Sequence, residues 1–234
     1  MIRPIPHRLT LLGLLLLFIT SATAQVGEQR HNLAIGVNGG LNMSSISLTP
    51  SIKQVSKKGI NGGFTARYIS EKYFKMICGA QVEVNFAQRG WEESYIDFPT
   101  LSYTRTMNYV EVPFLAHLAF GRDRGMQFFI HAGPQIAFLL SDSESISGNW
   151  EEALSYGANL TTEQHGKSID NKFDYGIAAG AGLELRTKAG NFLLEGRYYY
   201  GLADFYNSTK KDYFARSAHS IITVKLAYLF DLTF

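Results

Sequence analysis

The chain has 234 residues, with 22 basic side chains against 20 acidic ones and a formal net charge of +2. This balance, without any block of Lys and Arg, argues against a nucleic-acid-binding protein. The single cysteine, Cys78, excludes an intramolecular disulfide and any zinc site that needs more than one thiolate.

The first predicted element is a cleaved secretory signal peptide over residues 1–24. Arg3 and Arg8 form a basic start, residues 9–20 form an apolar run, and Ala22-Thr23-Ala24 is a small–x–small cleavage site. The apolar run is shorter than the roughly 20 residues of a membrane-spanning helix. An uncleaved N-terminal anchor is the alternative. Cleavage leaves one domain, residues 25–234, with 20 basic and 20 acidic side chains.

Eight segments of the exported chain then alternate apolar and mixed residues with a period of two, which predicts β-strands. No hydrophobic stretch of helical membrane-spanning length follows residue 24. The protein is therefore either a membrane β-barrel or a soluble periplasmic β-protein. In chain order the segments are 32–38, 60–68, 78–86, 109–120, 126–133, 173–184, 191–200 and 220–234.

The connections between these segments alternate between short and long without exception. Tight periplasmic turns and long outer loops produce this order in outer-membrane barrels, whereas a soluble sandwich has no reason to sort its loops. We predict an all-β fold, an eight-stranded antiparallel transmembrane β-barrel with short periplasmic turns and long extracellular loops, in the bacterial outer membrane. The short connections are 70–74, 121–125 and 187–190, and the long ones are 44–59, 88–106, 140–171 and 204–216.

Charged side chains of the predicted strands fall on the face that points into the lumen. A charge facing hydrocarbon at the bilayer midplane costs about 2–4 kcal/mol, which accounts for their absence from the lipid face. Three interpretations stay open: a salt-bridged core that plugs the barrel, a narrow gated path for ions or solutes, and a catalytic site. This lumen charge cluster consists of Arg67, Glu83, Glu111, Glu184, Arg186, Glu195, Arg197 and Lys225, with Asp174, His117 and His131 nearby.

Motifs of enzyme chemistry are missing from the sequence. Neither GxSxG nor HExxH occurs, and His117 and His131 on neighbouring strands have no clear third metal ligand. We therefore predict no catalytic residue, no cofactor and no metal site, and expect a structural or interaction role in the cell envelope. A narrow pore for small solutes or ions is the alternative function.

The predicted outer loops are the candidates for partner recognition, because loops carry recognition on a rigid scaffold. The 140–171 loop is acidic and the 44–59 loop is basic, so they either pair across the barrel mouth or bind a cation or a partner. The 88–106 loop is aromatic, and either extends the barrel as a hairpin or contacts lipid headgroups. Residues 153–162 are a candidate for one extra hairpin. The residues behind these expectations are Lys53, Lys57 and Lys58 in the basic loop, Asp142, Glu144, Glu151, Glu152, Glu163 and Asp170 in the acidic loop, and Trp91, Tyr95, Phe98 and Tyr103 in the aromatic loop.

Four stretches give the chain a resemblance to a known family. They are NYVEVPFLAHLAF (108–120), HAGPQIAFLL (131–140), FDYGIAAGAGLEL (173–185) and EGRYYYGLADF (195–205). In their order and spacing the chain resembles the PorT-like outer-membrane β-barrel family of Gram-negative bacteria, over essentially the whole exported chain. The resemblance implies an eight-stranded barrel and no known reaction. The founding member is linked to a protein secretion system, a role that likeness of fold does not transfer.

The last predicted strand ends in an aromatic residue. In the barrels that this chain resembles, such an ending is the signal for insertion, which implies that Phe234 is read by the barrel-assembly machinery with support from Tyr228 and Phe230. The expected partners are thus outer-membrane lipid, the barrel-assembly machinery, and envelope or secretion-system proteins that contact the loops 44–59, 88–106 and 140–171.

Overall fold

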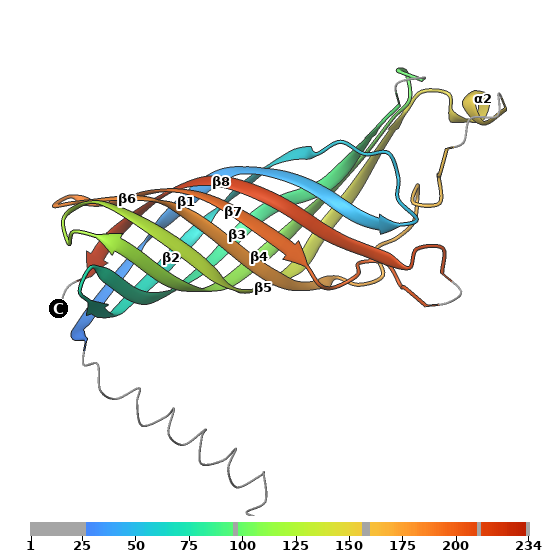
Figure 1. Cartoon of the computed structure of the whole chain (residues 1–234). Coiled ribbons are helices and arrows are strands. Elements are labelled where there is room, and N and C mark those ends of the chain that lie inside the picture. The colour runs from blue at the N-terminus through green and yellow to red at the C-terminus, as the bar shows by residue number, and fades with distance from the viewer. Residues whose placement is uncertain (1–26, 96–97, 156–159, 210–211, 233–234) are drawn as a thin grey trace, which may run out of the picture.

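A computed structural model describes residues 27–95, 98–155, 160–209 and 212–232 of the chain. Eight antiparallel strands form a closed barrel, and one short helix lies at its far end (Figure 1). Their bounds are β1 Glu28–Thr49, β2 Lys57–Tyr73, β3 Met76–Ser94, β4 Ser102–Gly121, β5 Gly125–Ser147, α2 Trp150–Ser155, β6 Phe173–Thr187, β7 Gly190–Gly201 and β8 Arg216–Leu232.

Every strand pairs with the next one in the chain, and β8 pairs with β1 to close the ring. The closing seam is long and regular, running from Leu33 opposite Leu232 to Thr49 opposite Arg216. The predicted eight-stranded antiparallel barrel is therefore confirmed. The predicted order of connections is confirmed as well: the short turns are 74–75, 122–124 and 188–189, and the long connections are 50–56, 95–101, 148–172 and 202–215.

The strands extend further toward the outer end than the sequence predicted, so the predicted loop bounds 44–59, 88–106 and 140–171 are wrong. The inward positions of these segments continue the alternation, with Ile46, Trp91 and Tyr103 all buried. The 88–106 segment forms the hairpin extension that was one of its two expectations. β5 pairs with β6 only as far as Phe138, but with β4 as far as Ser147. As a result, β3, β4 and β5 project beyond the rest of the barrel (Figure 1).

The candidate hairpin at 153–162 is replaced in part by a helix. α2 covers residues 150–155, and residues 160–162 form no strand. Residues 156–159 lie outside the described residues. No helix in the described part of the chain has the length and apolar character needed to cross a membrane.

The two faces of the barrel wall differ in kind, as the period of two requires. Large apolar side chains such as Phe64, Phe114 and Leu226 point outward and are exposed in the isolated chain. Inside, an apolar layer fills the periplasmic end, and a larger aromatic layer fills the extracellular end. The first layer consists of Ala34, Ile69, Ile77, Ala119, Phe129, Leu193 and Leu229, and the second of Ile46, Leu48, Trp91, Tyr103, Met107, Tyr109, Ala137, Phe205, Tyr206 and Phe214.

Candidate functional site

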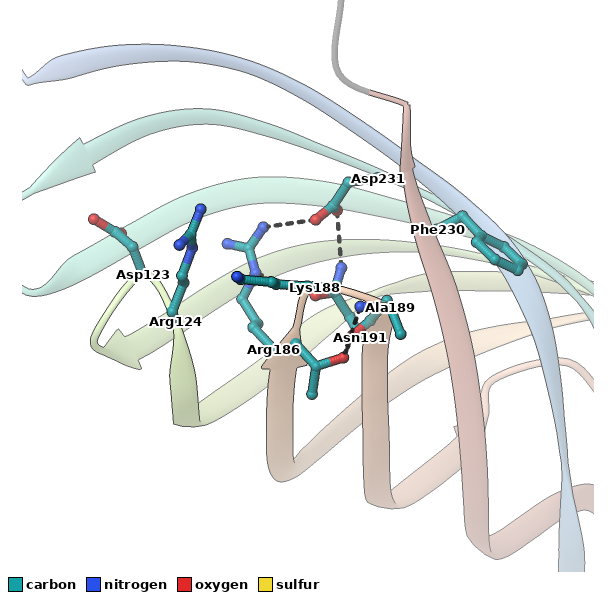
Figure 2. A pocket seen from close by; sticks show the side chains of 10 residues that line it. Asp123, Arg124, Arg186, Lys188, Ala189, Asn191, Phe230 and Asp231 are labelled. Carbon is teal, nitrogen blue, oxygen red and sulfur yellow. Dashed lines mark hydrogen bonds and ion pairs between the residues drawn. The ribbon is translucent and has the colours of Figure 1, made fainter.

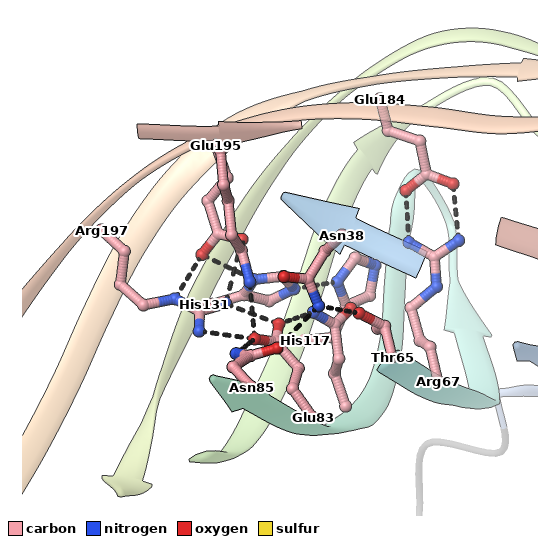
Figure 3. A network of polar contacts seen from close by, with 12 residues as sticks. Asn38, Thr65, Arg67, Glu83, Asn85, His117, His131, Glu184, Glu195 and Arg197 are labelled. Carbon is pink, nitrogen blue, oxygen red and sulfur yellow. Dashed lines mark hydrogen bonds and ion pairs between the residues drawn. The ribbon is translucent and has the colours of Figure 1, made fainter. Parts of the chain in front are cut away.

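A network of buried ionisable side chains lies between the two apolar layers. Their centre is Glu83, which accepts hydrogen bonds from both terminal nitrogens of Arg197 at 2.8 and 2.9 Å and from Lys225 Nζ at 2.5 Å. Arg197 also donates to Glu195 through Nε at 2.8 Å. Figure 3 shows Arg197 reaching from β7 toward these carboxylates. Two carboxylates and two cations therefore neutralise one another in a buried site.

A second ion pair lies closer to the periplasm. Arg67 on β2 donates to both oxygens of Glu184 on β6, at 2.6 and 2.7 Å, in the two-pronged geometry that suits a guanidinium and a carboxylate (Figure 3). Both side chains are buried. Arg186 lies nearer still to the periplasmic end, 3.8 Å from Glu184 and 3.2 Å from Asp231. The Arg67–Glu184 pair spans the lumen between opposite walls of the barrel.

The two lumen histidines lie against each other. His117 Nδ1 is 2.7 Å from His131 Nε2, and His131 Nδ1 is 3.2 Å from a Glu195 oxygen. Because a carboxylate only accepts, His131 donates through Nδ1 to Glu195. The two rings thus extend the central network from Glu195 by two further hydrogen bonds. Among the residues that the structure describes, no group of three His, Cys, Asp or Glu side chains has metal-binding geometry.

Glu111 pairs with Arg89, which falls in the predicted 88–106 loop but lies on β3. Arg89 Nε donates to Glu111 at 2.7 Å, and Arg89 Nη1 donates to Asp174 at 2.5 Å. The guanidinium also lies over the rings of Tyr109 and Tyr199, with its carbon 4.6 and 4.8 Å from the two ring centroids. Arg89 is completely buried, and through Glu111 and Asp174 it links β3 to β4 and β6 inside the lumen.

The extracellular end holds a further buried carboxylate that sequence reasoning missed. Glu93 accepts from Trp91 Nε1 at 3.0 Å, from Gln164 Nε2 at 2.9 Å and from the Tyr95 hydroxyl at 3.1 Å, and His165 Nε2 lies 3.1 Å away. Burial and the Glu93 carboxylate both raise the pKa of Tyr95 above its usual value, so the phenol stays protonated and donates. These contacts attach the 160–172 segment to β3.

The basic 44–59 segment and the acidic 140–171 segment do not form the ion pairs with each other that were one of the two expectations for them. Asp142 and Glu144 both contact Arg105 of β4 at 2.5 Å. No ion pair joins Lys53, Lys57 or Lys58 to an acidic side chain in the described part of the chain. Arg89, Glu93 and Arg105 are absent from the lumen cluster predicted from the sequence, but they share the odd-numbered, inward parity of Glu83 and Glu111, which is the signal that could have identified them.

The lumen contains little free space. A cavity lined by Asn61, Glu111, Tyr199 and Lys225, among others, has a volume of about 10 Å³. That is at the lower limit for one water molecule. The periplasmic apolar layer lies beneath it, with Phe129 completely buried. In this state the described barrel is a packed core.

At the periplasmic end, a polar hollow of about 380 Å³ lies between the turns (Figure 2). Asp231 accepts from Arg186 at 3.2 Å and from Asn191 at 2.8 Å, while Lys188 and Arg124 line the same hollow. Of the predicted assembly residues, Phe230 points outward beside this site and Tyr228 is half-buried. Phe234 lies outside the described residues.

Residues 23–207 match the family profile described as "Outer membrane protein beta-barrel domain", which covers most of the chain. The chain belongs to this family. Bacterial outer-membrane location follows from membership. A comparison with curated proteins finds no match.

Solved structures similar to this family member are outer-membrane proteins of low sequence identity. The outer membrane protein OprG of Pseudomonas aeruginosa is 12% identical, with a TM-score of 0.44 over 87% of this chain and 98% of that one. Neisserial surface protein A is 11% identical, with a TM-score of 0.40 over 84% and 99% of the two chains. The attachment invasion locus protein Ail of Yersinia pestis, solved with the heparin analogue sucrose octasulfate, is 13% identical, with a TM-score of 0.37 over 86% and 100%.

Proposed function

We propose that this protein is a closed outer-membrane barrel with a structural or interaction role in the cell envelope, without catalytic activity. The observation that carries the proposal is the filled lumen. Buried ion pairs occupy its middle, and apolar side chains occupy both ends. A solute path would require these groups to separate, leaving charges in a site with little water. The alternative function, a narrow pore, needs such an opened state.

Conductance of the full-length protein in planar bilayers separates the two functions. We expect no unitary openings above the background of protein-free bilayers. Single-channel steps in the wild-type protein that change when Glu111 or Arg197 is reversed in charge would establish the pore instead. The difference between boiled and unboiled gel mobility, measured on the same preparation, verifies that the tested material is a folded barrel.

The interaction surface in this proposal is the projecting outer end. β3, β4 and β5 continue past the other strands there, and the 160–172 segment is held against them by Glu93 and Arg105. Rigid strands with attached loops are a suitable scaffold for recognition. Envelope or secretion-system proteins are the partners we propose for this end, with outer-membrane lipid around the wall. We also propose that the chain is a PorT-like member of its family.

Export and assembly complete the proposal. Cleavage after residue 24 would release the exported chain, and the barrel-assembly machinery would recognise the final strand through Phe234. Deleting Phe234 should lower the amount of membrane-inserted, heat-modifiable protein several-fold, while deleting the exposed Lys53 of the opposite end should not. Equal yields of inserted protein from both deletions would remove Phe234 from this role. Mass spectrometry of the mature N-terminus checks the cleavage site.

A further inference from the structure

The periplasmic turns carry cations that have no carboxylate partner. Lys75, Arg122, Arg124 and Lys188 are all exposed, and within the described residues none of their side chains makes an ion pair or a hydrogen bond. They come from all three short turns, between β2 and β3, between β4 and β5, and between β6 and β7. This end of the barrel therefore has unneutralised positive charge.

Nearby carboxylates cannot supply the missing partners, because other groups already engage them. Asp123 binds Arg30 at 2.9 Å and Lys72 at 2.7 Å, and these hydrogen bonds hold the pKa of Asp123 below its usual value. Asp231 binds Arg186 and Asn191. Glu28 binds Arg30, and Glu71 accepts from Tyr73. An anionic group from outside the chain would neutralise the four unpaired cations.

Two neighbouring hollows bring these cations together. One, of about 680 Å³, is lined by Phe74, Lys75, Arg122, Arg124 and Met126, among others. The other is the 380 Å³ hollow of Figure 2, which contains Lys188. Arg124 lines both hollows. Its turn, between β4 and β5, therefore shares one hollow with the β2–β3 turn and the other with the β6–β7 turn. A ligand with an anionic group at this position would reach cations from every periplasmic turn.

An exposed aromatic residue stands beside the same cations. Phe74 is 98% exposed, and its backbone φ of 54° lies in the left-handed region that disfavours a bulky side chain. Met126 lies in the same hollow and is 66% exposed. A turn that only had to reverse the chain would be more stable with Gly or Asn at position 74. An apolar ligand surface next to the anionic group explains why a Phe is there.

We propose that this periplasmic rim binds an anionic phospholipid of the inner leaflet of the outer membrane. Lys75, Arg122, Arg124 and Lys188 contact the phosphate-bearing headgroup, and Phe74 and Met126 contact the glycerol and upper acyl region. Aromatic side chains collect at this depth of a membrane, and clustered Lys and Arg attract anionic lipid. An acidic protein or a cell-wall carboxylate would satisfy the cations but would leave Phe74 unexplained.

Native mass spectrometry of the folded, detergent-solubilised full-length protein tests this binding. Phosphatidylglycerol and phosphatidylethanolamine of equal chain length are added in turn, and we expect tighter retention of the anionic lipid. The variant K75Q/K188Q should weaken that retention about thirtyfold, and K75Q/R122Q/R124Q/K188Q on the order of a thousandfold, from the usual contribution of each basic group. K53Q/K58Q removes two exposed lysines at the opposite end and should leave retention unchanged.

Phe74→Asn separates lipid binding from folding, because Asn accepts the left-handed backbone of this turn. We expect this variant to keep the heat-dependent mobility of a closed barrel and to lose part of the phosphatidylglycerol retention. Equal retention of the two lipids by the wild-type protein would overturn the proposal. So would loss of retention in K53Q/K58Q as large as that in K75Q/K188Q, or saturation of the rim by an acidic peptide with no response to phosphatidylglycerol.

Discussion

Each buried carboxylate in the middle of the lumen faces a cation at hydrogen-bond distance. Glu83 has two such partners, and Arg197 in turn contacts Glu195. Removing one member of a buried pair is more damaging than the pair's net contribution suggests, because the remaining charge stays buried without its partner. The sequence could show that these charges share the lumen. It could not show which carboxylate meets which cation, since that depends on side-chain geometry across the barrel.

Glu83→Gln should therefore destabilise the folded barrel by about 3 kcal/mol or more, because Arg197 and Lys225 are left to share Glu195. Urea unfolding in lipid vesicles, followed by loss of the heat-modifiable band, measures this free energy. Glu151→Gln makes the same chemical change at an exposed position of α2 and should shift the free energy of unfolding by less than about 0.5 kcal/mol. Equal stability of the two variants would contradict the role given to Glu83.

At the level of the strand, period-two alternation predicted all eight elements but not their outer ends. In the membrane the outward residues are apolar, and the pattern is visible; beyond it, Gln88 and Glu92 replace them while Arg89 and Trp91 stay inside. Polar side chains on both faces resemble a loop in sequence. In these outer segments only the burial of every second residue continues. That alternation can be followed from the sequence only when the strand it extends is already known.

Close packing inside the wall also depends on strands having small residues at the correct positions. A Cβ added to Gly182 of β6 would lie 2.1 Å from the Leu194 carbonyl oxygen and 2.5 Å from the Phe129 ring. Gly196 on β7 faces outward, and nothing lies within 4 Å of a Cβ there. The two glycines therefore differ in what an added methyl group would meet.

Gly182→Ala should reduce the fraction of folded barrel and destabilise it by about 1–3 kcal/mol, the usual cost of overpacking a core. Gly196→Ala should leave both quantities unchanged or slightly improved. Boiled and unboiled gel samples from matched refolding reactions give the folded fraction. Equal stability of the two alanine variants would mean that Phe129 and the Leu194 backbone can shift to accommodate the added methyl group, contrary to this prediction.

For the molecule as a whole, closing the ring brings together the charges that neutralise one another in the lumen. Glu83 and Lys225 lie on β3 and β8, and Arg67 and Glu184 on β2 and β6. An open sheet would not bring these partners together. The alternating connection lengths predicted the ring topology from sequence. The packed state of the lumen depends on volumes and rotamers, which the alternation does not encode.

Cysteines at Leu41 and Val224 test the seam, because these outward residues are direct partners between β1 and β8. In a Cys78→Ala background, we expect oxidation to link L41C and V224C and to give faster non-reduced gel migration after boiling. V37C/V224C is the matched control, since Val37 pairs with Tyr228, four residues or roughly 13 Å along the strand from Val224. Equal linkage in both variants would mean that the seam has no fixed register.

Both tryptophans of the chain lie at the extracellular end. Trp91 is fully buried, with its ring centroid 6.0 Å from that of Phe205, and the Trp150 and His165 rings form a T-shaped pair with centroids 4.6 Å apart. The intrinsic tryptophan fluorescence of the protein therefore originates entirely from this end. Its emission wavelength is an optical reporter of whether the projecting strands stay packed, read without any label while the surrounding lipid is varied.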